Sequence, residues 1–300
     1  TGREFPEISK KAVVVMAGDH GVAAEGISAY PQEVTAQMVL NFAGGGAAIN
    51  VLARHAGVQV VVVDVGVATL LDHPQIISRK IRPGTANMVE GPAMSRAEAI
   101  QALETGIWVA GELAEAGCQM LATGEMGIGN TTASSAMMAA LLQVPALDVT
   151  GRGTGLDHEA VSRKAGIIDR AIAVNRPDPG DPLDVLGKVG GLEIGALAGL
   201  TLGAAARRVP VVIDGFISTT AALIAAKLAP ESLNFMIASH VSAEMAHRKL
   251  LNYLNLKPVL ELEMRLGEGT GAVLAMNIIE AALKINREMA TFESAGVSKK

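Results

Sequence analysis

Short apolar runs rich in β-branched residues recur along this chain and alternate with longer stretches of helical periodicity. They occupy residues 12–16, 58–63, 119–122, 209–213 and 234–238. Strands that are covered on both faces are apolar throughout, so these runs are typical of a parallel sheet buried between helices. With the right-handed βαβ crossovers that the alternation implies, they predict a doubly wound, Rossmann-like α/β domain over residues 10–255.

Helix signals complete this outline. Ser95-Arg-Ala-Glu98 has the spacing of a capping box and predicts a helix that runs to Ala116 and ends at Gly117. Beyond Pro258 we expect residues 256–300, together with 1–9, to form a small helical cap that carries a glycine-rich loop. The apolar stretch 194–206 is well short of the roughly 20 residues of a membrane span and predicts a buried helix.

Composition excludes several classes of function. Half of the 300 residues are hydrophobic and 18% are charged, which indicates a compact core. The net charge is −5 and the basic residues are scattered, so no nucleic-acid partner is expected. Residues 1–11 lack the apolar core of a signal peptide, and no membrane partner is expected either. Cys118 is the one cysteine, which predicts a buried thiol in a reducing cytoplasm.

Polar and glycine residues follow each of the predicted strands. The segments are Gly18-Asp19-His20-Gly21, Asp64-Val-Gly66, Thr123-Gly-Glu125, Asp214-Gly215 and Ser239-His240. Because the carboxyl ends of parallel strands meet at one edge of a sheet, these segments predict a shared ligand site at that edge.

Residues 124–132, Gly-Glu-Met-Gly-Ile-Gly-Asn-Thr-Thr, follow a predicted strand and open a helix. Gly127, Gly129, the hydroxyl of Thr131 and the helix dipole suit a phosphate, with Asn130 as the expected N-cap. The segment has neither the Gly-Lys-Ser/Thr of a Walker A loop nor a Gly-x-Gly-x-x-Gly, so we expect a monophosphate. An ordinary capped turn is the alternative.

A second glycine cluster, residues 150–157, precedes a predicted helix that carries Lys164. Lys164 falls two turns into this helix, where it either reaches back to a phosphate or lies exposed. Gly153 of the cluster belongs to the same candidate phosphate site. Ser239 and Ser242 can cap the helix that follows them, donate to that phosphate, or do both.

Glu268 lies between glycines in the run Arg265-Leu-Gly-Glu-Gly-Thr-Gly-Ala272. The glycines let backbone and substrate approach closely, and the apolar residues after them limit the water around the carboxylate, an environment that suits a general base. The alternative is a glycine-rich turn whose glutamate faces solvent. The chain has no His-Glu-x-x-His, no cysteine pair and no Gly-x-Ser-x-Gly, so we expect no metal, no other cofactor and no serine triad.

Taken together and in this order, the motifs resemble the nicotinate-nucleotide–dimethylbenzimidazole phosphoribosyltransferase family of cobalamin biosynthesis. The matching segments are residues 16–21 (Met-Ala-Gly-Asp-His-Gly), 30–35 (Tyr-Pro-Gln-Glu-Val-Thr), 124–132, 151–155, 214–216, 239–240 and 266–271. The resemblance implies transfer of ribose 5-phosphate from nicotinate mononucleotide to 5,6-dimethylbenzimidazole or a related base, which forms α-ribazole 5′-phosphate and nicotinate. It also implies a homodimer. Family members usually carry an additional N-terminal helical segment, whereas this chain begins just before the first predicted strand.

The resemblance also assigns roles to residues of this chain. Glu268 matches the family's catalytic base, which removes the azole proton, and Glu125 matches a second acid near the base. The phosphate is expected to contact Gly127, Gly129, Asn130, Thr131, Gly153, Lys164, Ser239 and Ser242. The acceptor base is expected to lie against Tyr30, Met38 and Leu266.

Other functions remain open on the sequence alone. A phosphoribosyltransferase that uses phosphoribosyl pyrophosphate usually presents two adjacent acids and a Thr-Gly phosphate loop after a strand, whereas residues 211–215 hold one acid and no such loop. A non-catalytic nucleotide-binding homologue would keep the phosphate site and have no need of Glu268. A phosphoribosyltransferase with another acceptor base is the third alternative.

Overall fold

The structure, a computed structural model, describes the chain except residues 1, 3, 154, 156, 299 and 300, so Thr154 and Leu156 of the second glycine cluster lie outside the described residues. In the described part, six parallel strands form one sheet in the order β3-β2-β1-β4-β5-β6. This is the doubly wound order, with its switch point between β1 and β4, and it confirms the predicted fold class. The strands are β1 (Lys11–Gly18), β2 (Gln59–Gly66), β3 (Ile76–Ser78), β4 (Met120–Met126), β5 (Val211–Ile213) and β6 (Met236–Ala238).

Helices connect the strands and cover the sheet. The α-helices are α1 (Glu33–Ala43), α2 (Ala48–Ala56), α3 (Arg96–Glu115), α4 (Asn130–Leu142), α5 (His158–Asn175), α6 (Pro182–Val189), α7 (Leu192–Ala206), α8 (Phe216–Leu228), α9 (Met245–Tyr253) and α10 (Thr270–Glu288). Short 3-10 helices occupy Gly21–Glu25, Ala146–Val149 and Pro230–Phe235.

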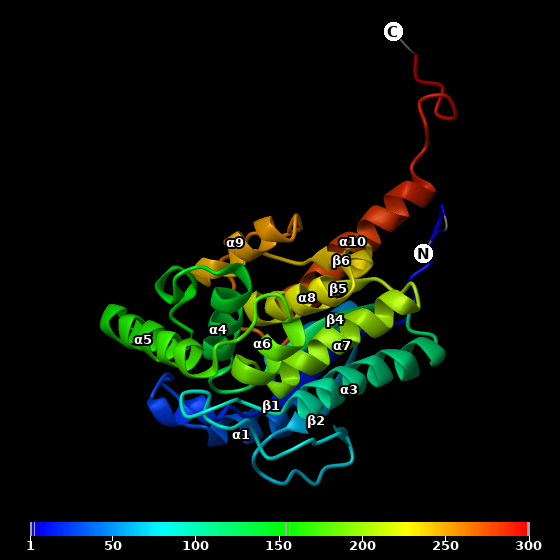
Figure 1. Cartoon of the computed structure of the whole chain (residues 1–300). Coiled ribbons are helices and arrows are strands. Elements are labelled where there is room, and N and C mark those ends of the chain that lie inside the picture. The colour runs from blue at the N-terminus through cyan, green and yellow to red at the C-terminus, as the bar shows by residue number, and fades with distance from the viewer. Residues whose placement is uncertain (1, 3, 154, 156, 299–300) are drawn as a thin grey trace.

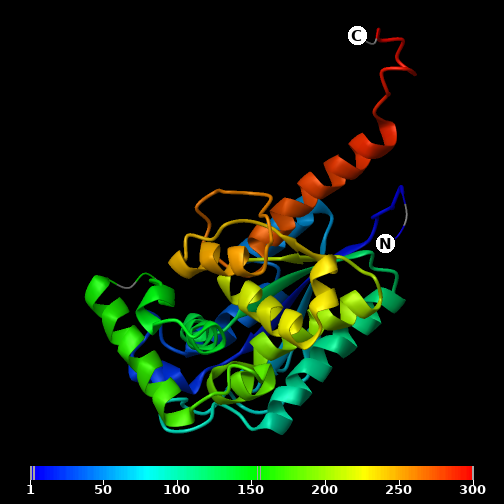
Figure 2. The ribbon, with the colours of Figure 1, turned by 45° about the horizontal axis from the view of Figure 1, so that its top comes forward.

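The sheet lies between two helical layers, as Figures 1 and 2 show. Helices α3, α7 and α8 cover one face, and α1, α2 and the first part of α10 cover the other. Alternation along β1 explains the division, since Val14 and Met16 belong to the first core and Val13 and Val15 to the second. All four side chains are fully buried.

One strand was not predicted, and one predicted strand boundary was wrong in a way that affects the site. The strand β3 was missed, because three residues at the sheet edge leave too short a pattern to recognise. β4 continues to Met126, so Glu125 lies in the strand itself and not in the loop after it. Pairing with β1 extends β4 beyond the predicted run and explains its length.

The helix signals were confirmed. Ser95 Oγ accepts the Glu98 N–H at 3.2 Å and a Glu98 carboxylate oxygen accepts the Ser95 N–H at 2.7 Å, which is the predicted capping box at the start of α3. The apolar stretch 194–206 forms most of α7, which is buried as predicted. Among the described helices, only the stretch Glu33–Ala56 is long and apolar enough to cross a membrane, and a turn at residues 44–47 divides it into α1 and α2.

The C-terminal segment starts within the core and ends outside it. Ala272, Val273 and Met276, in the first half of α10, are buried against the sheet beside α2. The second half of α10 and residues 289–298 extend away from the body of the molecule in Figures 1 and 2. The division into a large domain and a cap built from residues 256–300 with 1–9 stays a prediction.

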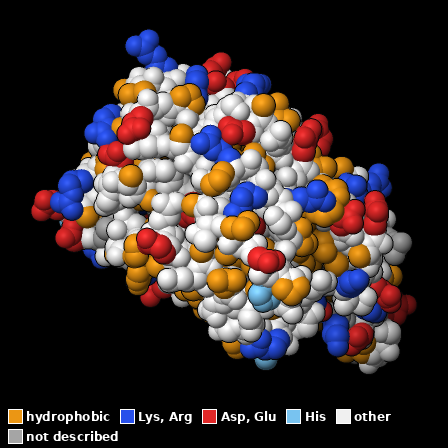
Figure 3. All heavy atoms as spheres, turned by 90° about the horizontal axis from the view of Figure 1, so that it is seen from below, with side chains coloured by type: hydrophobic (Ala, Val, Ile, Leu, Met, Phe, Trp, Pro, Cys, Tyr) orange, Lys and Arg blue, Asp and Glu red, His pale blue; other side chains and the backbone are white. Residues whose placement is uncertain are grey.

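Acidic and basic side chains alternate over the face shown in Figure 3, without a broad patch of either sign. This mixed surface offers no extended basic footprint of the kind that phosphate backbones require. It agrees with the scattered distribution of Lys and Arg in the sequence.

Two glycines bring α3 and α7 into backbone contact. A Cβ on Gly106 would lie 1.8 Å from the Ala196 carbonyl oxygen, and one on Gly199 would lie 1.9 Å from the Leu103 carbonyl oxygen. Such approaches leave no space for even one methyl group, so the close packing of this helix pair depends on glycine.

We predict that Gly106→Ala lowers the free energy of unfolding by about 3 kcal/mol, because the added methyl group meets backbone atoms that cannot rotate away. The matched control is Gly166→Ala in α5, where a Cβ would meet nothing within 4 Å. That change is expected to raise the free energy of unfolding by about 0.5–1 kcal/mol through helix propensity. Denaturant titration measures both, and equal stabilities would contradict the close packing of α3 and α7.

Candidate active site

A cavity of about 520 Å³ opens beyond the carboxyl ends of β4, β5 and β6. Most of the residues predicted to form the site line it, namely Tyr30, Met38, Glu125, Gly127, Gly129, Asn130, Thr131, Gly153, Ser242, Leu266 and Glu268. Segments that are far apart in the sequence therefore meet in one place, as the topology predicts.

Two of the predicted strand ends do not take part. His20, after β1, is buried and its Nε2 lies 2.6 Å from Glu193 Oε1, behind the cavity wall. Asp64, near the end of β2, accepts the Gly66 and Val67 N–H groups at 3.1 and 2.9 Å. The prediction of one site shared by all five strand ends was thus too broad, because partners outside the cavity occupy His20 and Asp64.

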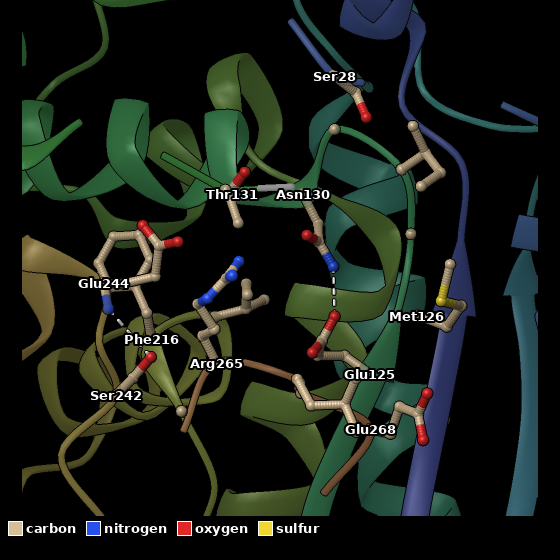
Figure 4. A pocket seen from close by; sticks show the side chains of 18 of the residues that line it. Ser28, Glu125, Met126, Asn130, Thr131, Phe216, Ser242, Glu244, Arg265 and Glu268 are labelled. Atoms are coloured by element: carbon tan, nitrogen blue, oxygen red, sulfur yellow. Dashed lines mark hydrogen bonds between the residues drawn. The ribbon is translucent and has the colours of Figure 1, made fainter. Parts of the chain in front are cut away.

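The loop between β4 and α4 has the geometry of an anion site. A Cβ on Gly127 would lie 2.3 Å from the Gly18 carbonyl oxygen, and Gly129 has a φ of +99°, so both positions require glycine. Gly129 is the N-cap of α4, and Asn130 is its first residue. Our prediction of Asn130 as the N-cap was wrong, because its side-chain amide donates to Glu125 Oε2 (Figure 4).

Lys164 is buried behind this loop. It is 1% exposed, and its Nζ donates to Thr131 Oγ1 at 2.8 Å, so the alternative of an exposed helix lysine was wrong. Gly153, with a φ of +50°, packs against both side chains: a Cβ there would lie 2.9 Å from Thr131 Oγ1 and 3.2 Å from Lys164 Nζ. Burial lowers the pKa of Lys164 to about 8, against the opposing charge of Glu244. A cation thus sits beside the helix N-terminus.

The two serines of the segment after β6 differ in position. Ser242 lines the cavity, and its Oγ accepts the Glu244 N–H at 3.2 Å. Ser239 is fully buried outside the cavity lining, with its Oγ 2.9 Å from His240 Nδ1. Of the pair, Ser242 is therefore the one that lines the cavity.

The loop that carries Glu268 is a left-handed turn. Gly267, Glu268 and Gly269 have φ values of +79°, +61° and +91°, a conformation that side-chain-bearing residues rarely adopt. A Cβ on Gly267 would lie 2.4 Å from Glu125 Oε1, and one on Gly269 would lie 2.6 Å from Val13 Cγ2. Gly267 and Gly269 are therefore required both by their positive φ and by the lack of room for a side chain. Glu268, which lies between them, is held in a strained backbone conformation.

Asp214 fixes this turn. Its Oδ2 accepts the Gly269 N–H at 3.2 Å and its Oδ1 accepts the Ala272 N–H at 3.0 Å, so one carboxylate caps α10. Burial raises the pKa of Asp214, and the charge of His240 and the backbone N–H groups oppose that shift. A carboxylate at a helix N-terminus is stabilised by the dipole as well as by these hydrogen bonds.

Glu268 itself is 6% exposed, so the alternative of a solvent-facing glutamate was wrong. Its Oε2 accepts the N–H of Ile49, in the first turn of α2, at 3.3 Å. Burial raises the pKa of Glu268, the Ile49 hydrogen bond opposes the shift, and the charge of Asp214 adds to it. A carboxylate with a raised pKa is a stronger base than an exposed one.

Glu125 is a different kind of acid. Burial raises its pKa to about 8, the charge of Asp214 adds to the shift, and the hydrogen bond from Asn130 opposes it. At neutral pH the group is consequently protonated. Two neighbouring carboxyl groups with such different environments are suited to separate roles.

Figure 4 shows how the walls are divided. Thr131, Ser242 and Glu244 lie on one side of Glu125, and Met126 lies on the other. Apolar side chains in the lining include Tyr30, Val34, Met38, Met126 and Leu266, together with Ile27, Ile128, Ile217 and Phe216, the last of them beside Ser242. Tyr30 and Leu266 are 56% and 59% exposed and stand at the rim. One end of the cavity thus suits an anion and the other a flat apolar ring.

Sequence reasoning did not assign several residues of the lining. Arg265 points its guanidinium group into the cavity, and Phe216 and Glu244 contribute to the wall beside Ser242 (Figure 4). Arg265 and Glu244 both lie within motifs that the sequence made visible, so adjacency to Leu266 and Ser242 was the available signal. Within the described residues, no group of three or more His, Cys, Asp or Glu side chains is placed to hold a metal ion.

A mononucleotide-sized cavity beyond the carboxyl ends of parallel strands, with an anion loop and a buried carboxylate in its lining, is the geometry of an α/β transferase that acts on a nucleotide. A family model described as phosphoribosyltransferase matches residues 1–297. The chain belongs to the nicotinate-nucleotide–dimethylbenzimidazole phosphoribosyltransferase family.

Relatives of that name are similar over the full chain. The one from Chloroflexus aggregans is 62% identical over 100% of this chain and 85% of its own length. The one from a Roseiflexus species is 60% identical over the same shares. A crystal structure of CobT from Thermus thermophilus has a TM-score of 0.95 and 52% identity, and the match covers 100% of this chain and 90% of that one.

We predict that Asp214→Asn loosens the Glu268 turn, because the amide nitrogen would face a backbone N–H group where a carboxylate oxygen now accepts. Amide hydrogen exchange at Gly269 and Ala272 should become at least about tenfold faster, the size expected for one lost buried hydrogen bond. The control is Asp64→Asn, a buried acid near the end of β2 that does not contact the turn. Unchanged exchange in Asp214→Asn would remove this residue as the anchor.

Proposed function

We propose that this chain transfers ribose 5-phosphate from nicotinate mononucleotide to 5,6-dimethylbenzimidazole or a related base, and so forms α-ribazole 5′-phosphate and nicotinate. The reaction belongs to the lower-ligand branch of cobalamin biosynthesis. The observation that carries the proposal is the place of Glu268, a buried carboxylate at a cavity with an apolar wall and an anion loop. Family membership supports the same conclusion.

The reaction requires that the two substrates be held in the right orientation and that one base accept a proton. Nicotinate leaves from a cationic pyridinium nitrogen, so its departure neutralises charge and requires no proton donor. A ring nitrogen of the acceptor attacks C1′ from the opposite face as the bond to nicotinate breaks, which inverts the β anomer to α. The proton on the other ring nitrogen passes to Glu268.

The phosphate end of the cavity would hold the donor in place. We assign the phosphate to the loop of Gly127 and Gly129, with Thr131 and Ser242 as hydroxyl donors and Lys164 as the cation. Gly153 permits their close approach.

Tyr30, Met38 and Leu266 would contact the acceptor ring at the other end.

Glu125 would act in its neutral form. Its carboxyl group lies beside Gly267 and receives the Asn130 amide, and a pKa of about 8 keeps it protonated while Glu268 accepts the proton. A neutral acid at this point donates a hydrogen bond and adds no further negative charge beside Asp214 and Glu268.

We also propose a homodimer and a cytoplasmic location. Exposed apolar side chains on and after α10 support association, since Ile278, Ile285, Met289 and Phe292 are 50%, 56%, 71% and 65% exposed. Cys118 is a buried free thiol, which agrees with a reducing compartment.

The test is product analysis after the purified chain is incubated with nicotinate mononucleotide and 5,6-dimethylbenzimidazole without added metal. We expect α-ribazole 5′-phosphate from the wild type and a turnover lower by about 10²–10⁴-fold in Glu268→Gln, because the amide cannot accept the proton. The control is Glu125→Gln, which resembles the protonated acid and should retain turnover within about tenfold. Equal losses in the two variants would contradict the division of roles, and no product from folded wild type would favour another acceptor or a non-catalytic homologue.

The pH dependence should follow the two shifted groups. Glu268 must be ionised to accept a proton, so kcat should fall on acidification through a pKa above the ordinary value of 4.5. Lys164 must be protonated to hold a phosphate, so the KM for the nucleotide should rise as the pH passes about 8. Steady-state kinetics between about pH 5 and 9 would measure both, and an acid limb in kcat that persists in Glu268→Gln would rule this residue out as its source.

A further inference from the structure

His247, in the first turn of α9, is completely buried and uses both ring nitrogens. Nδ1 accepts the Ser242 N–H at 2.8 Å, and Nε2 lies 2.8 Å from Thr219 Oγ1. A backbone N–H group can only donate, so Nδ1 must be unprotonated. In the neutral ring the proton is then on Nε2, which donates to Thr219 Oγ1, and the Thr219 hydroxyl donates to the Gly215 carbonyl oxygen at 2.8 Å.

The surroundings keep the ring neutral. Burial lowers the pKa of His247 to about 3, and the charges of His240 and Arg248 act in the same direction. His240 meets the ring edge-on, with centroids 6.1 Å apart. A second proton on Nδ1 would oppose the Ser242 N–H, so the hydrogen-bonded arrangement exists only for the neutral ring.

These bonds determine what Ser242 can offer to a ligand. Its N–H is occupied by His247, and its Oγ accepts the Glu244 N–H at 3.2 Å (Figure 4). Its hydroxyl proton is the donor that remains, and Ser242 lines the cavity. The segment between β6 and α9 is irregular there, so neither a helix nor a strand holds Ser242 in place.

The same bonds connect two loops of the site. Gly215, at the start of α8, lines the cavity and directly follows Asp214, the anchor of the Glu268 turn. The chain of hydrogen bonds from Ser242 through His247 and Thr219 ends on Gly215. These bonds thereby connect the loop that carries Ser242 to the loop that carries Asp214 and Gly215, and fix their relative positions.

We infer that His247 is a positioning residue for the phosphate of the nucleotide, which it serves by holding the Ser242 hydroxyl toward the cavity through a neutral ring with its proton on Nε2. The inference rests on the proposed function in that it takes nicotinate mononucleotide as the ligand. His247 makes no contact with the cavity and so takes no part in proton transfer. Its effect should therefore appear in binding of the nucleotide and not in turnover.

The experiment compares His247→Gln with His247→Asn. The asparagine side chain can place an acceptor where Nδ1 lies and so keep the Ser242 N–H bond, whereas glutamine places its amide where Nε2 lies and loses that bond. We expect His247→Gln to raise both the KM for nicotinate mononucleotide and its calorimetric Kd by about five- to tenfold, the size of one neutral hydrogen bond. His247→Asn should stay within about threefold of the wild type, and kcat and the KM for the base should be unchanged in both.

A second pair of variants, at Thr219, tests the same inference if a His247 variant fails to fold. Thermal unfolding would show whether each variant is folded. Thr219→Val removes the acceptor for Nε2–H and should raise the Kd by at least about threefold, whereas Thr219→Ser keeps the hydroxyl and should not. Equal Kd values within each pair, or a loss confined to kcat, would overturn the inference. Wild type that binds the nucleotide without forming product would overturn the proposed function alone, and the Kd comparison would still judge His247; wild type that does not bind it would overturn both.

Discussion

The hydrogen bonds that Asp214 accepts from the start of α10 hold the chemical part of this protein together. Asp214 follows β5, and its partners Gly269 and Ala272 lie 55 and 58 residues farther along the chain. Glu268 immediately precedes the first of them, so the position of the proposed base relative to the sheet follows from this contact. The N–H groups at a helix start can hold a buried carboxylate without a cation, because they carry partial positive charge and have no partner within the helix.

The crowding of carboxyl groups around that contact explains their different properties. Burial raises the pKa of Asp214, Glu125 and Glu268 alike, but a different set of neighbouring groups opposes that shift at each carboxyl group. The charge of His240 and backbone N–H groups stabilise the charge of Asp214, the Ile49 N–H stabilises that of Glu268, and Glu125, with a pKa of about 8, is mostly protonated at neutral pH. A low-dielectric site holds two charges and one neutral acid more readily than three charges. The anchor of the turn, the proposed base and the proposed neutral acid are thus distinguished by their partners and not by their residue type.

Local sequence patterns predicted the parts of the site that depend on neighbouring residues. Glycine at positions 127 and 129 and around Glu268 is required by conformation and by close approach, both of which leave a trace in the sequence. The errors arose where contacts with another element of the fold decide. Asn130 has the residue type of an N-cap but is bonded to Glu125, and Lys164 has the position of a surface lysine but lies under Thr131. No spacing rule reveals a partner that another strand or helix supplies.

What the sequence by itself determined is the alternation of apolar strands and helices, hence the doubly wound sheet, and the set of glycine, hydroxyl and acidic residues that follow its strands. These are consequences of periodicity and backbone conformation, which act over a few residues. Only the tertiary structure decided which strand ends share the cavity, that burial raises the pKa of Glu125 and of Glu268, and that His247 stands behind Ser242. Burial, electrostatic coupling and long-range hydrogen bonds set these properties, and each depends on groups that come together only when the chain is folded.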